Sequence, residues 1–289
     1  MKKKGIKRVA ILAATGCLLL ALSVTSFAAT GSGYVSYRDA IKATAFTKNA
    51  TMSAQFEVKD NGKVIFAGTG TQKRDNENNS FKTSITVAGV TKAYEASLVG
   101  GNLIAKVDDK YYKASKDAEK SGKDQRENLS ASSSTVKLAE MLTDTLVGDV
   151  KNQFVSDGQT ISVKLSGAQI PELARLALSA AAENSNRMGD FKNNDKQDKG
   201  MKLVMDKMPK LSNMDVKSIE MTATVDGKTL KDNQFTVTLT GQDLKGVSHE
   251  LTVMLNAKIT DVGNTKVDTI NTTGKVVNAI DKAEQYLNR

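Results

Sequence analysis

The sequence predicts an α+β protein built on a large, curved antiparallel sheet, an incomplete barrel with a few helices covering its concave face. Three observations lead to this prediction. Residues 247–259 alternate apolar and polar side chains over thirteen positions, and a period of two is typical of a strand with one buried face. At about 3.3 Å per residue, such a strand spans roughly 40 Å. Shorter alternating segments joined by tight turns come before it, and segments with helical spacing lie between them.

The N-terminus has the parts of a signal peptide. Five basic residues within residues 2–8 precede an apolar run at residues 9–24, and Ser26 and Ala28 are the small residues that a signal peptidase reads. Cleavage after Ala28 leaves a mature chain of 261 residues. We therefore expect a secreted, extracytoplasmic protein of the cell envelope. Retention of the segment as a membrane anchor and lipidation at Cys17 are the alternatives.

The composition excludes several classes of function. Cys17 lies in the expected signal peptide and is the only cysteine. The mature chain therefore has no disulfide, thiolate metal site or thiol nucleophile. The mature chain has 36 Lys and Arg against 32 Asp and Glu, interspersed, and no Trp. This pattern is typical of a solvated surface and argues against nucleic-acid binding, and it leaves only peripheral contact with a membrane. We expect no cofactor.

The first half of the mature chain predicts an antiparallel meander. Small residues at 29–36 predict a flexible leader, and residues 37–46 predict a short helix. Alternation then begins at Met52, and Asn61-Gly62 is typical of a two-residue hairpin turn. Parallel pairing needs long crossovers, which these short turns do not supply. The further strands are expected at residues 64–73, 81–87, 94–98 and 103–107, before a solvated loop at 115–134.

The second half mixes helices and strands. Ile170-Pro171 begins a helix that is apolar around most of its girth and extends to about residue 183. A second solvated loop covers 184–200, and methionines recur at helical spacing from Met201 to Met208. The other expected elements are a helix at 135–146, a hairpin at 154–165, a second meander at 219–259 and a closing helix at 276–287. We expect a single domain over 37–289; two pseudo-repeated halves are the alternative.

Few residues have a pattern that points to catalysis. His249 is the only histidine, which excludes histidine triads and multi-histidine metal sites. It is either a hydrogen-bonded structural imidazole or a ligand-touching, pH-sensing group. Asp108-Asp109 fits a turn better than an acid and base pair. The acidic and amide residues of 190–198 lack the glycine and glutamate of a calcium loop. We therefore expect a protein that is not an enzyme, with no metal site.

Two local segments add a resemblance. They are residues 165–167 leading into 170–173, and residues 241–243 leading to 246–249. These short sequence segments are similar to segments of exported proteins of Gram-positive spore-forming bacteria. The order of elements over most of the mature chain resembles the LolA-like, lipoprotein-carrier half-barrel fold. The resemblance implies an apolar cavity between sheet and helices that holds a lipid or another hydrophobic ligand.

The predicted function is therefore an exported binding protein with a hydrophobic ligand between the sheet and the helix after Pro171. The methionine stripe is either an adaptable wall of this pocket or ordinary core. The alternative function is an envelope protein–protein interaction module with a filled core, which makes contacts through its sheet edges or through an exposed pair, Tyr111 and Tyr112. The expected ligand-binding residues are Leu173, Leu176, Ala177, Met201, Met205, His249, Leu251 and Val253.

Overall fold

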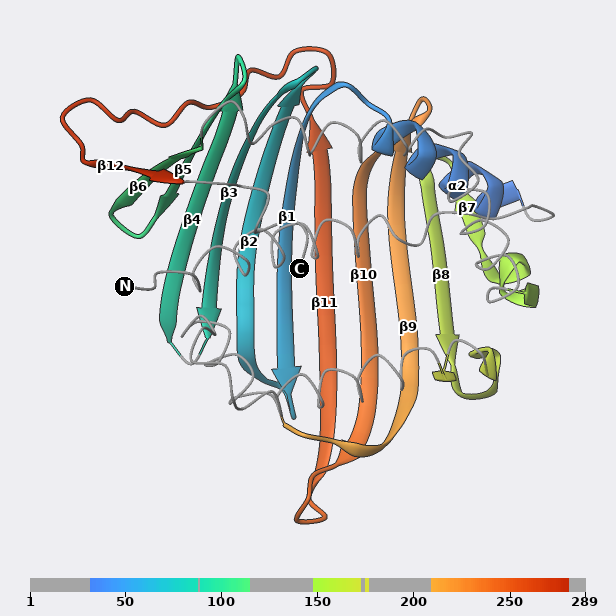
Figure 1. Cartoon of the computed structure of the whole chain (residues 1–289). Coiled ribbons are helices and arrows are strands. Elements are labelled where there is room, and N and C mark those ends of the chain that lie inside the picture. The colour runs from blue at the N-terminus through green and yellow to red at the C-terminus, as the bar shows by residue number, and fades with distance from the viewer. Residues whose placement is uncertain (1–31, 88, 115–147, 173–174, 177–208, 281–289) are drawn as a thin grey trace.

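The structure is a computed structural model of the 289-residue chain and describes residues 32–87, 89–114, 148–172, 175–176 and 209–280. These residues form one open, curved sheet of twelve strands, with helix α2 (Ser32–Ala45) over one face near β8 to β10 (Figure 1). Two short 3-10 helices, η2 (Gly148–Gln153) and η3 (Gly167–Gln169), flank β7 and β8. The strands are β1 (Asn49–Asp60), β2 (Lys63–Asp75), β3 (Asn78–Val87), β4 (Val90–Val99), β5 (Asn102–Val107), β6 (Lys110–Ala114), β7 (Val155–Asp157), β8 (Thr160–Ser166), β9 (Ser212–Asp226), β10 (Thr229–Gln242), β11 (Ser248–Thr260) and β12 (Val277–Ile280).

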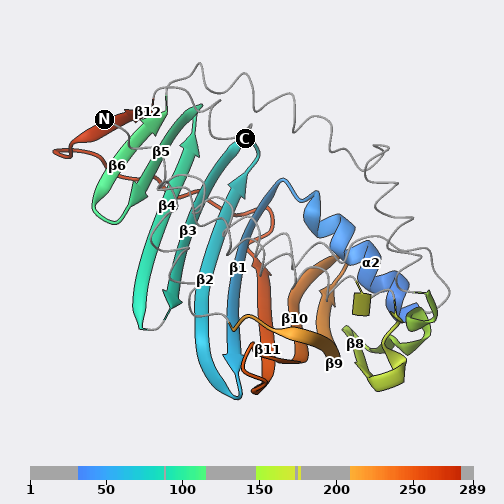
Figure 2. The same ribbon diagram turned by 60° about the horizontal axis from the view of Figure 1, so that its bottom comes forward.

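Two antiparallel meanders join side by side to make this sheet. The order across it is β12-β6-β5-β4-β3-β2-β1-β11-β10-β9-β8-β7. The pairing of β1 with β11 therefore joins the first meander to the second at the centre of the sheet. The predicted hairpin turn at Asn61-Gly62 is confirmed, because both residues have a positive φ. Figure 2 shows the curvature of the sheet.

The predicted closing helix is wrong at its beginning. Val277–Ile280 is β12, which pairs in parallel with β6, so the sheet is mixed rather than wholly antiparallel. The successive strands β1 to β6, which short turns join, pair antiparallel as predicted, but the prediction of an antiparallel sheet does not hold at β12, because the long crossover that parallel pairing needs is supplied by residues 261–276. These residues, called the strap below, lead from the end of β11 to the far edge of the sheet (Figure 1). Residues 281–289 lie outside the described part of the chain.

Alternation along each strand gives the sheet two different faces. The inner face is the one on which α2 packs, and the outer face is the other. On β11 the predicted alternation is confirmed: Leu251, Ala257 and Ile259 are buried on the inner face, whereas Lys258 and Thr260 are exposed on the outer face. Antiparallel pairing places directly opposed residues on the same face, so the register extends this assignment from strand to strand.

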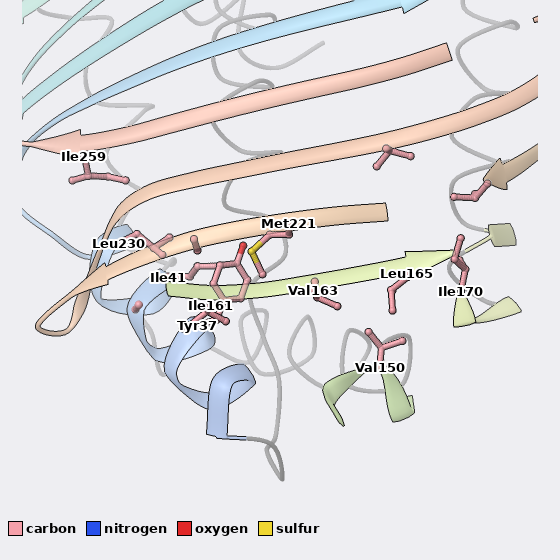
Figure 3. Packing of buried hydrophobic residues seen from close by; sticks show 14 of the residues in the cluster. Tyr37, Ile41, Val150, Ile161, Val163, Leu165, Ile170, Met221, Leu230 and Ile259 are labelled. Atoms are coloured by element: carbon pink, nitrogen blue, oxygen red, sulfur yellow. The ribbon is translucent and has the colours of Figure 1, made fainter. Parts of the chain in front are cut away.

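A cluster of buried hydrophobic residues lies between α2 and the inner face of β8 to β10 (Figure 3). The helix begins at Ser32, so the prediction of a flexible leader over 29–36 is wrong from that residue onward. Its extra turn is held by Tyr34, whose buried ring packs edge-on against Phe154 with centroids 5.0 Å apart. The buried cluster comprises Tyr37, Ala40, Ile41, Ala50, Val150, Ile161, Val163, Leu165, Ile170, Val216, Met221, Ala223, Leu230, Val237 and Ile259.

The burial of Tyr37 makes the folded protein less stable at alkaline pH. Burial raises the pKa of Tyr37 to about 12, and the hydrogen bond from its hydroxyl to Asn233 Oδ1 (3.3 Å) opposes this shift more weakly. Because the pKa is raised in the folded state, the stabilisation is complete below pH 10 and is lost as the pH rises towards 12. We expect the free energy of unfolding to fall by up to about 3 kcal/mol over this range.

Denaturant unfolding from pH 9 to 12 measures this effect, with Tyr37→Phe as the control that removes the ionisable group. The variant should lose less stability over the same pH range than the natural protein. Equal losses in the two proteins would show that Tyr37 does not titrate in the way its burial requires.

The strap crosses the outer face where β1 begins, β2 ends and β3 begins. Side-chain hydroxyl and amide groups of these strands hold it there. Thr265 is buried, and its hydroxyl lies 3.0 Å from that of Thr51. The Asn49 side chain accepts from the backbone N–H of Thr265 (2.7 Å) and donates to its carbonyl (3.0 Å). Farther along, the backbone N–H of Asp268 donates to Ser80 Oγ (2.9 Å). An extended segment can thus lie across these strands on polar contacts.

Candidate functional site

The apolar inner face continues well beyond the area that α2 covers. The helix makes its main contacts with β7 to β10, and it lies at that end of the sheet in both views (Figures 1 and 2). By register, the inner face extends from β11 through β1 to β5. Half-buried apolar side chains there are Leu255 and Val253 on β11, Phe56 and Met52 on β1, Phe66 on β2, Phe81 and Ile85 on β3, Leu98 on β4 and Leu103 on β5.

At the centre of this face an aromatic ring lies across a glycine. The rings of Phe56 and Phe66 are 4.8 Å apart, and Phe56 lies against Gly68 on the neighbouring strand. A Cβ atom at Gly68 would come within 2.4 Å of the Phe56 ring and 2.7 Å of the Ser84 carbonyl oxygen. Gly68 thus provides room for the ring, as glycine does where another group must approach a strand closely.

His249 lies at the end of the inner face, between two carboxylates. Its Nδ1 donates to Asp60, with the two carboxylate oxygens at 2.8 and 2.9 Å, and its Nε2 lies 3.8 Å from Asp243 Oδ2. The Asp243 carboxylate accepts from the backbone N–H groups of Val247 and Lys245. These bonds, the first above all, hold the pKa of Asp243 below its ordinary value, with a smaller contribution from His249.

The contacts of His249 match the structural interpretation of this residue. The imidazole links the end of β1 to the loop before β11. Asn61 adds to the same junction, because its backbone N–H donates to the Glu250 carbonyl (2.9 Å) and its side-chain oxygen accepts from the Glu250 N–H (2.9 Å). The sequence could not identify Asp60 as a partner, since 189 residues separate it from His249.

The predicted ligand-binding residues divide into three groups. His249, Leu251 and Val253 follow one another along the inner face of β11; Leu251 is 4% exposed and Val253 is half-buried. Leu176 is helical but 56% exposed. The Arg175 N–H donates to the Pro171 carbonyl (3.0 Å), as expected for a helix that begins there. The remaining four lie outside the described residues: Leu173, Ala177, Met201 and Met205.

Other predicted features have mixed outcomes. The pair Tyr111 and Tyr112 lies in β6 beside β12, and both side chains are half-buried rather than exposed as predicted. Asp108 has a positive φ in the turn before β6, which confirms its place in a turn, and it forms an ion pair with Lys92 (3.3 Å). The loops at 115–134 and 184–200, the helix at 135–146, the methionine stripe and the acidic and amide residues of 190–198 all lie outside the described residues.

A hollow of about 440 Å³ lies on the outer face, across β3, β2, β1, β11 and β10. Two adjacent rows of outer-face residues line it. Each is a transverse row, in which directly opposed residues of neighbouring strands follow one another across the sheet, and four residues that alternate with these rows along the strands complete the lining. The sequence analysis did not predict this hollow, because it depends on register between strands from both halves of the chain. The first row is Ser84, Thr69, Gln55, Asn256 and Gln234; the second is Thr86, Ala67, Glu57, Met254 and Thr236.

Two further properties concern only the described part of the chain. No helix there is long and apolar enough to cross a membrane. The same residues contain no group of three or more His, Cys, Asp or Glu side chains placed to hold a metal ion.

Comparison with known proteins does not place the chain in a family. No protein-family model and no curated protein matches it. LprF from Mycobacterium bovis, a solved structure, matches with 11% identity and a TM-score of 0.31, over 83% of this chain and 96% of LprF. A Thermobifida fusca protein assigned as a thioesterase II matches with 10% identity and a TM-score of 0.11, over 80% of this chain and 87% of that one. Similarities this low carry no argument about fold or function.

Proposed function

We propose that this protein is an exported, non-enzymatic binding protein that holds a hydrophobic ligand against the inner face of its sheet. The observation that carries the proposal is the extent of the apolar inner face, which continues from β11 to β5 beyond the area under α2. An apolar surface that continues over several strands and is only partly buried is typical of an interaction site.

The chemistry of the face favours a ligand with acyl or other hydrocarbon groups. Phe56, Phe66, Ile85 and Leu255 are half-buried apolar side chains in adjacent strands. Burying apolar surface of this kind stabilises a complex by about 25 cal/mol per Å². The LolA-like resemblance of the sequence implies the same class of ligand.

Organic extraction of the purified protein, followed by mass spectrometry, tests the proposal, together with titration by a fluorescent fatty acid. We expect Val253→Thr to weaken fatty-acid binding by about tenfold, because the added hydroxyl lies on the inner face without a partner from the ligand. Met254→Gln is the matched control, since Met254 is the next residue on β11 but lies on the outer face and is 40% exposed.

Thermal unfolding must show that both variants are folded. A natural protein that is empty after purification and does not bind the fatty acid would contradict the proposal. Equal binding by Val253→Thr and Met254→Gln would place any lipid site elsewhere.

A second candidate function is a protein–protein interaction module, and the edges of the sheet favour it. β7 and β12 are the outermost described strands, and Val155 on β7 is 62% exposed. An edge strand presents unpaired backbone groups to which a partner strand can add. Capture of one specific envelope protein that is lost with Val155→Pro, while the fatty acid does not bind, would support this function instead.

A further inference from the structure

We propose that the outer-face hollow binds a linear, neutral oligosaccharide that lies across the strands. This site is independent of the proposed inner-face function, because the two ligands would occupy opposite faces of the sheet. The proposal rests on four observations: a transverse row of neutral polar side chains, their lack of partners, the pairing of nearby charges, and the strap.

The row extends beyond the hollow to seven neighbouring strands. Each member is directly opposite the next in the strand register, so all seven side chains lie on the outer face. With neighbouring strands about 4.8 Å apart, the row is about 30 Å long. Every member is neutral and carries a hydroxyl or a carboxamide. In order from β3 to β8, this polar row is Ser84, Thr69, Gln55, Asn256, Gln234, Thr222 and Ser162.

The side chains of the polar row have unused hydrogen-bonding capacity. None of them forms a side-chain hydrogen bond with another residue of the described chain. The Oδ1 atom of Asn256, at the middle of the row, is buried without a partner. A buried acceptor without a hydrogen bond is unfavourable. Rotation of this amide towards a ligand hydroxyl would remove that cost.

The electrostatics of the hollow favour an uncharged ligand. Glu57 is its one charged lining residue and forms an ion pair with Lys59 (2.9 Å). In the same transverse row, Lys164 pairs with Glu220 (2.8 Å). The one charge in the lining is thus neutralised by a neighbouring side chain, so the lining itself has no unpaired charge to select an anion or a cation.

The hydrogen-bonding groups of a saccharide match those of the side chains in the hollow. Sugar hydroxyls both donate and accept, and so they match hydroxyl and carboxamide side chains, which also do both. Met254, 40% exposed in the second row of the hollow, offers an apolar contact for the C–H face of a sugar ring. The regular spacing of the strands suits a chain molecule with repeated polar groups better than a single small ligand.

The strap shows that this face already accepts an extended chain across its strands. It lies along the transverse row that includes Thr51 and Ser80, and hydroxyl groups of both residues hold it. The polar row is parallel to that row, four residues away along β1, or about 13 Å. The strap is itself a peptide segment, so an extended peptide is the other ligand to consider, and its binding is one outcome of the test below.

Isothermal titration calorimetry of the purified protein with chitohexaose and with cellohexaose tests the proposal. We expect binding of at least one of these neutral hexasaccharides. The double variant Gln55→Ala/Gln234→Ala should bind at least about tenfold more weakly, because it removes two carboxamides, each worth roughly 1 kcal/mol. Both side chains are exposed, so the variant should unfold at the same temperature as the natural protein.

Gln242→Ala is the matched control, since Gln242 is an exposed glutamine on the outer side of the same strand as Gln234 but lies outside the hollow. It should bind as the natural protein does. Failure of the folded natural protein to bind either hexasaccharide would overturn the proposal, as would full binding by the double variant or stronger binding of an extended serine- and threonine-rich peptide. Fatty-acid binding should be the same in all three proteins, which keeps this test separate from that of the inner face.

Discussion

Leu230→Ala is expected to lower the free energy of unfolding by about 2–5 kcal/mol, the usual cost of removing a buried leucine side chain. Leu230 is 2% exposed at the start of β10 and belongs to the buried cluster under α2. Its backbone N–H also donates to Thr44 Oγ1 of the helix (2.8 Å). The lost side chain would leave a cavity where strand and helix meet, and urea denaturation measures the loss.

Leu244→Ala is the control for this prediction. Leu244 is 86% exposed in the loop that follows β10, so its replacement should change the stability by no more than about 0.5 kcal/mol. Similar losses in the two variants would mean that the α2 cluster does not stabilise the fold in the way its burial indicates.

Gly68→Ala is expected to lower the free energy of unfolding by about 1–3 kcal/mol, because the added methyl group overpacks the site. The new methyl group would meet the Phe56 ring at 2.4 Å and the Ser84 carbonyl oxygen at 2.7 Å. The ring can turn away, but the carbonyl belongs to the paired strand β3 and can move only if the ladder between β2 and β3 shifts. The effect should appear as a lower midpoint of thermal unfolding.

Gly70→Ala provides a close comparison, because Gly70 is on the same strand and the same face. A Cβ atom there would find its nearest neighbours at 3.9 Å, which is ordinary van der Waals contact. This variant should be as stable as the natural protein or slightly more so, since alanine has less conformational freedom to lose. A larger loss at Gly70 than at Gly68 would contradict the role given to the Phe56 ring.

Local patterns predicted most strands, because alternation and turn chemistry depend on neighbours in the sequence. Residues 247–259 predicted β11 to within one residue at each end. The turns at Asn61-Gly62 and at residues 226–227 contain the positive-φ residues that their sequences favour. The same alternation separated the buried side of β11 from its exposed side. The alternation could not show which strands pair with β11.

The failures came from contacts between distant segments. Tyr34 extends α2 because Phe154 packs against it, and nothing near Tyr34 in the sequence indicates that contact. Val277–Ile280 is a strand because the edge of β6 is available for pairing, although the spacing of Val276 and Ile280 also fits a helix. The polar row of the outer face combines residues from seven separate strands on either side of the β1–β11 junction.

The β1–β11 pairing also determines when this protein can fold. Thr51 bonds to Thr265 across 214 residues of chain, and Asp60 to His249 across 189. β1 is synthesised well before its neighbour β11, because 189 residues of chain separate Asp60 from His249. Closing so long a loop costs entropy before any contact rewards it, which slows folding. Until β11 arrives, the first meander exposes an unpaired edge, and a chain in this state is prone to aggregate.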